Sequence, residues 1–287
     1  MPQLSSRRSF LGAGAAACAL SGARAGASVP EDAFAFRLGV ASYSFRKFSR
    51  ERAIQMTLAL GVRDINIKSF HLPLESTPEQ IRAARAEFES AGLTIDGGGN
   101  IAFDKEDDDA IRHTFEYARL AGMPLMVCAP TLRTLPMLEK FVREYDIRLA
   151  IHNHGPEDKI FPTPQAVLAA VKGMDARIGC CVDVGHTLRA GADPVGSLAD
   201  AGPRLLDIHM KDLRKAAEGR DCPVGDGMMP VVAIFGQLRK MRYAGGVMLE
   251  YETDADNPYP GMQKSFAYMR GALAGLQERF DAPDKKS

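Results

Sequence analysis

The sequence predicts an α/β protein folded as a (β/α)8 TIM barrel, and three observations support this class. Short apolar runs rich in β-branched residues alternate eight times with longer segments of helical spacing, over roughly 250 residues. Prolines and glycines stand where the helices should begin and end. No linker, low-complexity segment or break in composition divides the chain beyond its N-terminal region. An open doubly wound sheet is the alternative fold.

The eight predicted strands are short runs whose apolar residues alternate or are continuous. They are Leu38 to Tyr43, Asp64 to Lys68, Leu93 to Asp96, Leu125 to Ala129, Arg148 to His152, Ile178 to Asp183, Leu205 to His209 and Val247 to Tyr251. The clearest helical patterns between them cover Thr77 to Ala91 and Asp107 to Ala121.

Proline and glycine predict the ends of these elements. Pro164 and Pro194 stand in predicted first helical turns, and helices are expected to stop at Gly61, Gly92 and Gly122. The run Gly97-Gly98-Gly99 is expected to form a turn that needs positive φ after the third strand. A backbone nest for an anion is the alternative interpretation of this run.

The N-terminus has the features of an export signal. The segment Ser5-Ser6-Arg7-Arg8-Ser9-Phe10-Leu11 precedes a small-residue apolar run and the cleavage pattern Ala23-Arg24-Ala25. We predict a twin-arginine signal over residues 1–25, the twin-arginine translocon as export partner, a periplasmic or secreted protein, and a barrel over residues 36–280. A disordered basic tail and lipid attachment at Cys18 are alternatives. The apolar run is too short for a membrane span.

Composition excludes some classes of partner. The chain of 287 residues has a formal charge of +0, and removing the signal would leave 33 basic against 36 acidic residues. Because nucleic-acid binding usually requires a basic stripe, no such partner is predicted. The remaining cysteines, Cys128, Cys180, Cys181 and Cys222, do not form a disulfide framework, so we interpret them as buried, inert thiols.

Residues that bind divalent cations gather at the ends of the predicted strands. Five of the six histidines have this position, as do Asp183 and Glu250; the histidines are His71, His152, His154, His186 and His209. In a barrel, strand ends meet at one mouth, so the pattern predicts a metal-assisted active site there.

Four consecutive strands each contribute such a side chain near their ends. Side chains alternate between the two faces of a strand, so His152 and His154 lie on the same face of the fifth strand. The alternation alone therefore does not decide which of them is the ligand. Each residue also has a structural interpretation: a hydrogen-bonded core histidine, a helix N-cap for Asp183, or an ion pair with Lys211 for Glu250. Because four adjacent strands each carry such a side chain near their ends, a metal site is favoured over four separate structural roles.

Three motifs resemble the xylose isomerase-like TIM-barrel family of sugar isomerases and epimerases. They are Val-Asp-x-Gly-His at 182–186, His-Met-Lys-Asp at 209–212, and Val-Gly-Asp-Gly at 224–227 leading to the run from Tyr243 to Glu250. The likeness is specific from about residue 147 to 252 and architectural before that. It implies a divalent metal and a sugar whose carbonyl and neighbouring hydroxyl chelate it.

By position, Asp183, His209 and Glu250 match metal ligands of that family, whereas His152 stands where typical members have glutamate. We favour His152 as the fourth ligand. A set of two histidines and two carboxylates suits Mn²⁺, Zn²⁺ or Fe²⁺ better than Mg²⁺. In the epimerases of the family, the missing glutamate is one of the two proton-transferring bases, so here that pair is incomplete.

The resemblance implies a sugar isomerase or epimerase that acts through a metal-stabilised enediolate, and the predicted export favours an unphosphorylated sugar or keto-sugar as substrate. The base would be Glu250 or Glu252, and the acid His154 or His186. Candidates for substrate binding are Lys68, His71, Lys211 and Glu252. Alternatives are a keto-glycoside lyase or hydrolase on the same site, and a secreted sugar-binding protein without catalysis. An apurinic endonuclease is disfavoured because the chain has no basic excess.

Overall fold

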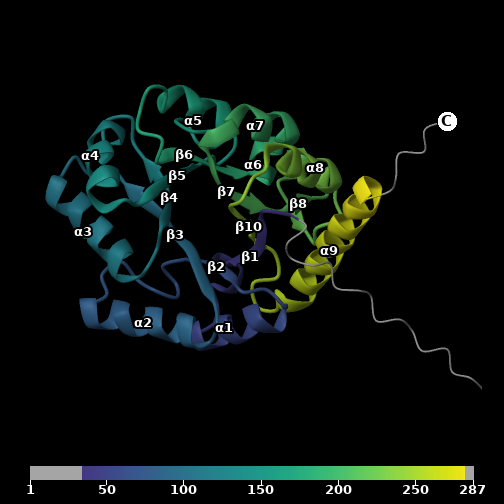
Figure 1. Cartoon of the computed structure of the whole chain (residues 1–287), viewed down its shortest axis with the longest axis horizontal. Coiled ribbons are helices and arrows are strands. Elements are labelled where there is room, and N and C mark those ends of the chain that lie inside the picture. Colours follow the sequence, from purple (N-terminus) through teal and green to yellow (C-terminus); the bar gives the residue numbers. More distant parts are fainter. Residues whose placement is uncertain (1–33, 282–287) are drawn as a thin grey trace, which may run out of the picture.

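Eight parallel strands close into a barrel in the computed structural model, which describes residues 34–281 (Figure 1). The order around the barrel is β1-β10-β7-β6-β5-β4-β3-β2. These strands are β1 Arg37–Ala41, β2 Asp64–Ile67, β3 Thr94–Phe103, β4 Leu125–Pro130, β5 Arg148–His152, β6 Ile178–Asp183, β7 Leu205–Met210 and β10 Gly246–Leu249. The predicted (β/α)8 class is therefore confirmed. A short antiparallel pair, β8 Asp212–Leu213 and β9 Asp221–Cys222, follows β7.

Helices surround the barrel as an outer ring (Figure 1). They are α1 Arg50–Ala59, α2 Pro78–Ser90, α3 Asp108–Leu120, α4 Leu135–Tyr145, α5 Pro164–Ala170, α6 Val184–Arg189, α7 Pro194–Ala201, α8 Val231–Met241 and α9 Tyr259–Asp281. Thr77 and Gln80 form a reciprocal capping box at the start of α2, and Asp107 caps α3. Both helices predicted from spacing are present, with ends shifted by one residue.

The glycine run 97–99 lies inside β3, so the turn predicted there is wrong. A Cβ atom on Gly97 would lie 2.7 Å from the backbone oxygen of Leu125, and one on Gly99 would lie 2.0 Å from that of Val127. The missing side chains thus allow β3 to approach β4 closely, across a register shift between Gly98 and Ile101. Only Gly99 of the three has positive φ, at 108°.

The core has two parts. A large apolar cluster joins the helices to the outer face of the sheet, and a small one fills the inside of the barrel with Leu125, Val127, Ala150 and Cys181. All four cysteines of the described residues are free and buried, as predicted. Burial raises the pKa of the Cys180 thiol to about 12, which keeps it protonated and unreactive.

The predicted export signal, including Cys18, lies outside the described residues. Over residues 34–281, no helix combines the length and the apolar character that a membrane crossing requires.

Substitution of Gly99 by alanine is expected to destabilise the protein more than substitution of Gly173. Both residues have positive φ, which costs alanine about 1–2 kcal/mol, but a Cβ at Gly173 meets nothing within 4 Å. At Gly99 the new methyl group would also collide with the β4 backbone. Chemical denaturation of both variants measures the difference, and equal losses would contradict the proposed role of Gly99 in strand packing.

Candidate active site

Four buried side chains converge at the mouth of the barrel. His152 ends β5, Asp183 ends β6, His209 lies on β7 and Glu250 directly follows β10, and these four strands are neighbours in the barrel. Their exposed fractions range from 0% to 6%. One ligand atom from each lies within 4.8 Å of the others. The structure thus brings together all four residues predicted as metal ligands.

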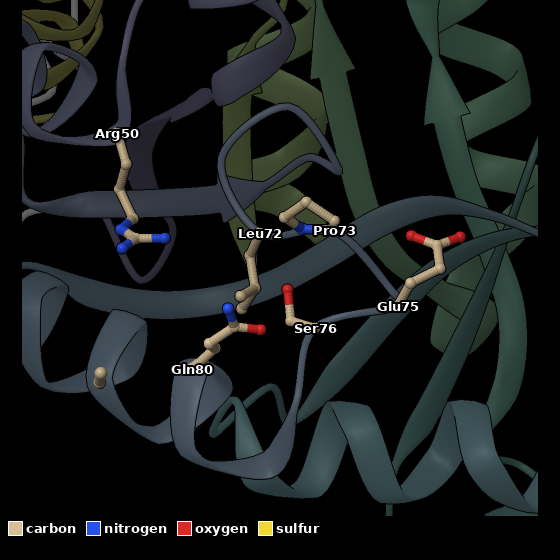
Figure 2. A pocket seen from close by; sticks show the side chains of 7 residues that line it. Arg50, Leu72, Pro73, Glu75, Ser76 and Gln80 are labelled. Carbon is tan, nitrogen blue, oxygen red and sulfur yellow. The ribbon is translucent and has the colours of Figure 1, made fainter.

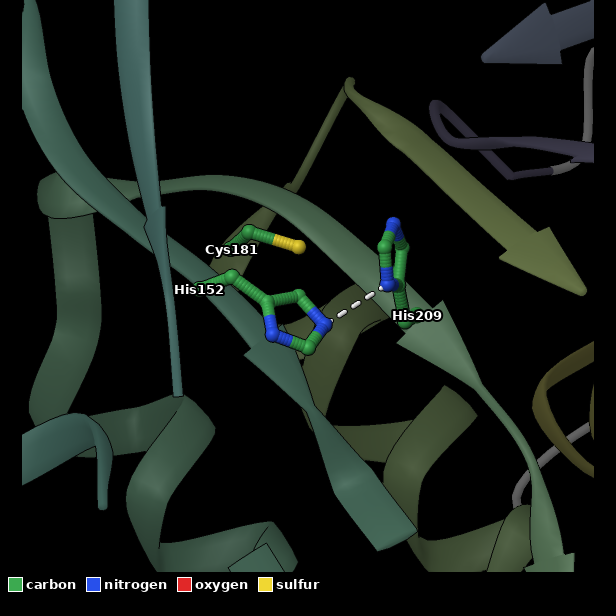
Figure 3. A group of neighbouring side chains, drawn as sticks. All are labelled: His152, Cys181 and His209. Atoms are coloured by element: carbon green, nitrogen blue, oxygen red, sulfur yellow. Dashed lines mark hydrogen bonds between the residues drawn. The ribbon is translucent and has the colours of Figure 1, made fainter. Parts of the chain in front are cut away.

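The histidine rings and the carboxylate oxygens face one another. His152 Nε2 is 2.8 Å from His209 Nδ1, and the latter is 3.1 Å from Glu250 Oε2. Asp183 Oδ2 is 3.5 Å from His152 Nε2. Figure 3 shows the His152 and His209 rings pointing at each other from separate strands, with the Cys181 thiol beside them.

The donor set fits a divalent cation. His152 Nδ1 and Asp183 Oδ2 are buried and make no hydrogen bond, although the Lys211 ammonium forms an ion pair with Asp183 Oδ2 at 3.0 Å. Two imidazoles and two carboxylates within one shell suit Mn²⁺, Zn²⁺ or Fe²⁺. Cys181 is a weaker candidate ligand, because burial raises the pKa of its thiol well above the ordinary value and disfavours the thiolate.

Local structure fixes Asp183 so that one of its two oxygens remains available. Asp183 Oδ1 accepts a hydrogen bond from the His186 backbone at 2.7 Å and thereby caps α6. The Asn153 side chain makes two hydrogen bonds with the Asp183 backbone. It accepts one from Asp183 N at 3.0 Å and donates one to Asp183 O at 3.3 Å. The capping interpretation and the metal interpretation of Asp183 are thus compatible, each using a different oxygen.

Burial and neighbouring charges set the protonation states. Burial lowers the pKa of His152 well below its ordinary value, so this imidazole is neutral at pH 7 and can act as a ligand or base. Burial and the nearby His186 also lower the pKa of His154. Burial alone would favour neutral Asp183, but the Lys211 ammonium and other neighbours bring the pKa of this carboxyl well below its ordinary value.

A cavity of about 310 Å³ opens onto the four-residue cluster. It is lined by Tyr43, Lys68, Ser69, Phe70, Asn100, His152, His154, His186, His209, Glu250 and Glu252. Its size falls near the lower end of small-molecule sites, about 300–1,000 Å³. Both predicted acids and two of the predicted substrate-binding residues, Lys68 and Glu252, therefore line the same space as three of the candidate metal ligands.

Two predicted substrate-binding residues lie outside this cavity. His71 is 2% exposed, and its Nδ1 contacts Ser42 Oγ at 2.9 Å, which also accepts a hydrogen bond from the Lys68 backbone. Lys211 is 3% exposed and lies among the carboxylates. Neither residue belongs to the lining of the cavity, although Lys211 directly contacts Glu250 and Glu252, which do.

Sequence reasoning missed several residues of the cavity. Asn100 follows the glycine run, and its Nδ2 lies 3.1 Å from His154 Nε2. Because a turn was wrongly predicted at this point, Asn100 was not recognised as a candidate site residue. Tyr43 and Phe70 form an edge-on aromatic pair with ring centroids 5.7 Å apart, and Phe70 is 54% exposed. The two-residue alternation of side chains along a strand could have predicted that Cys181 lies beside the metal-ligand candidates, because Cys181 and Asp183 lie on the same face of their strand.

A second hollow, of about 450 Å³, lies between α1 and α2 beside the loop after β2 (Figure 2). Its lining includes Arg50, Glu75 and Gln80. The Arg50 guanidinium donates to Glu87 and to the His71 backbone oxygen. The polar side chains of this hollow do not form a set suited to catalysis or metal binding, so we assign the active site to the barrel mouth.

The model of the xylose isomerase-like TIM barrel family matches residues 57–272. The chain belongs to this family. One relative is the rhizopine catabolism protein MocC of Rhizobium meliloti, 28% identical over 144 residues, which cover 45% of this chain and 44% of that protein. Another is an inosose dehydratase of Geobacillus kaustophilus, 31% identical over 94 residues, which cover 27% and 30%. The chain thus spans less than half the length of these relatives.

Solved structures share the fold. A D-psicose 3-epimerase from Clostridium cellulolyticum superimposes with a TM-score of 0.68 at 17% identity, covering 83% of this chain and 99% of that one. The probable 3-DHS dehydratase AsbF of Bacillus anthracis gives 0.68 at 14% identity, covering 82% and 98%. Both an epimerase and a dehydratase are therefore built on this barrel.

The contribution of Asp221 to stability is expected to fall as pH rises from about 4 to 7. Burial raises the pKa of this carboxyl from 3.8 to about 7, so between these values the folded state binds more protons than the unfolded one. The contribution is complete below pH 4 and is lost as pH rises through 7. Denaturant titrations should show the stability of the wild type falling relative to that of Asp221→Asn over this range, and a constant difference between the two proteins would contradict this assignment.

Proposed function

We propose that this protein is a divalent-metal-dependent sugar isomerase or epimerase, which acts on an unphosphorylated sugar or keto-sugar. The observation that carries the proposal is the convergence of His152, Asp183, His209 and Glu250 from four adjacent strands. Membership of the xylose isomerase-like family supports a sugar-modifying activity. Export through the twin-arginine translocon remains part of the proposal, on the basis of Arg7 and Arg8.

His152, Asp183, His209 and Glu250 would hold the cation, Mn²⁺, Zn²⁺ or Fe²⁺ rather than Mg²⁺, and when bound it would supply Lewis-acid polarisation of the substrate carbonyl. The protein's own contribution is to hold the substrate and move a proton. Glu250 is suited to act as base because it is ionised: burial opposes this, but His209, Lys68 and Lys211 lower its pKa well below the ordinary value. Glu252, with a side chain 40% exposed, is the alternative base.

Groups around the cavity complement this chemistry. Lys68 Nζ is 3.3 Å from Glu250 Oε1 and faces the cavity, where its charge can attract a substrate oxygen that becomes negative. His154 and His186 line the cavity with ring centroids 5.7 Å apart, and they are the candidates that return a proton. Asn100 can orient His154 through its 3.1 Å contact.

A keto-glycoside lyase or hydrolase is the second candidate function. Two-base epimerisation needs a proton acceptor on each face of the substrate, and here neutral His152 takes the place of one carboxylate. Elimination needs only one base and an acid for the leaving group. The exposed Phe70 beside Tyr43 offers an apolar surface that a glycoside's leaving group could contact.

We expect Asp183→Asn combined with His209→Ala to abolish tight metal binding. The double variant removes one charged and one imidazole ligand from a site that offers four. Elemental analysis of the purified protein should give about one equivalent of Mn, Zn or Fe for the wild type and little for the variant. Asp200→Asn, an exposed change on α7, is the control. Absence of metal in the wild type would favour the non-catalytic sugar-binding alternative.

Incubation in D₂O followed by product analysis distinguishes the candidate reactions. Incubation with a panel of ketohexoses and keto-glycosides should incorporate deuterium at the carbon next to the carbonyl, because proton removal there is common to isomerisation and elimination. Glu250→Gln should slow this exchange by about 100-fold or more, the usual weight of a general base. Product analysis by NMR then separates an epimer from an eliminated product. Binding of a sugar with neither exchange nor a new product would contradict an enzymatic role.

A further inference from the structure

The Lys211 ammonium lies at the centre of three carboxylates. Its Nζ is 3.0 Å from Asp183 Oδ2, 3.2 Å from Glu250 Oε2 and 2.9 Å from Glu252 Oε1. The side chain is only 3% exposed, so water screens these contacts weakly. Lys211 is thus a buried cation with more anionic partners than one positive charge can neutralise.

The oxygens that contact Lys211 are the same ones that face the two histidines. Asp183 Oδ2 is the oxygen nearer His152, and Glu250 Oε2 is the oxygen nearer His209. The other Asp183 oxygen is engaged in capping α6. A divalent cation held by the four-residue cluster would therefore use oxygens that the ammonium already contacts.

Gly185 provides the space through which Lys211 reaches this position. A Cβ atom on Gly185 would lie 2.5 Å from Lys211 Cγ and 2.6 Å from Cδ, closer than real contacts allow. Gly185 belongs to α6 and does not have positive φ, so backbone conformation does not require glycine there. The absent side chain instead accommodates the Lys211 stem. This is a second, independent sign that the fold is built to place an ammonium here.

We propose that Lys211 is an internal counter-cation that competes with the divalent metal for Asp183 and Glu250 and thereby limits the metal affinity of the site. This inference rests on the metal-dependent function proposed above. Like charges repel within a few ångströms, so a metal at these oxygens requires the ammonium to withdraw.

The structure offers a place for the withdrawn ammonium. Glu252 Oε1 already contacts Lys211 Nζ at 2.9 Å, and Asp221 accepts a hydrogen bond from the Glu252 backbone beside it. The ammonium would move from Asp183 towards Glu252 by a change of the lysine rotamer. Lys211 would then hold Glu252, which lines the cavity, while the metal neutralises Asp183 and Glu250.

Titration of the full-length metal-free protein with Mn²⁺, followed by electron paramagnetic resonance or calorimetry, tests the inference. Lys211→Met removes the competing charge and should tighten Mn²⁺ binding by about tenfold or more. Gly185→Ala keeps every charge but displaces the lysine stem, and should also tighten binding. Lys172→Met, an exposed change in the loop before β6, removes the same charge elsewhere and should leave binding unchanged.

The outcomes separate this inference from the proposed function. Tighter binding in both site variants supports competition, and circular dichroism checks that each variant is folded. If the wild type binds Mn²⁺ and both variants bind it equally or more weakly, the metal site stands and the role of Lys211 is overturned. If no variant binds Mn²⁺ or Zn²⁺, the metal-dependent function itself fails, and the inference with it.

Discussion

Charge buried at the mouth of the barrel is the constraint on which the rest of this structure depends. Asp183, Glu250, Lys211 and Lys68 are each at most 7% exposed, and an unpaired ion in such a place would be strongly destabilising. Every one of them therefore contacts an opposite charge. The barrel makes this possible because it brings the ends of chain-distant strands to one small region.

A helix cap at Asp183 and the absence of a side chain at Gly185 position these charges. Asp183 ends one strand and caps the next helix with the same side chain, which fixes the direction of its second oxygen. Gly185, two residues on, leaves room for the stem of Lys211. The Val-Asp-x-Gly-His motif thus has a physical explanation in which aspartate supplies a helix cap and a candidate metal ligand, and glycine leaves room for the neighbouring lysine.

The histidine at position 152 alters the electrostatics of the site. A carboxylate there would add a negative charge next to Asp183, whereas His152 is neutral because burial lowers its pKa. The cluster therefore holds fewer negative charges for the same number of lysines. In the proposed metal site, this balance would favour metals that accept nitrogen ligands and would strengthen the proposed competition from Lys211.

The sequence by itself determined the fold class and the grouping of four side chains at the mouth of the barrel. Alternation of apolar runs and helical spacing predicts the barrel, and the ends of parallel strands meet at one mouth whatever the loops do. That is why His152, Asp183, His209 and Glu250 could be grouped without coordinates. Period two likewise placed His152 and His154 on one face.

Only the tertiary structure decided the contacts that depend on residues distant in the chain. The glycine run 97–99 is strand because β4 packs against it, which local sequence does not encode. His71 turns inward to Ser42, 29 positions away, so it lies outside the cavity. Lys211 contacts three carboxylates from two other strand ends. Such distances are set by closure of the barrel and side-chain packing, and sequence spacing carries no information on either.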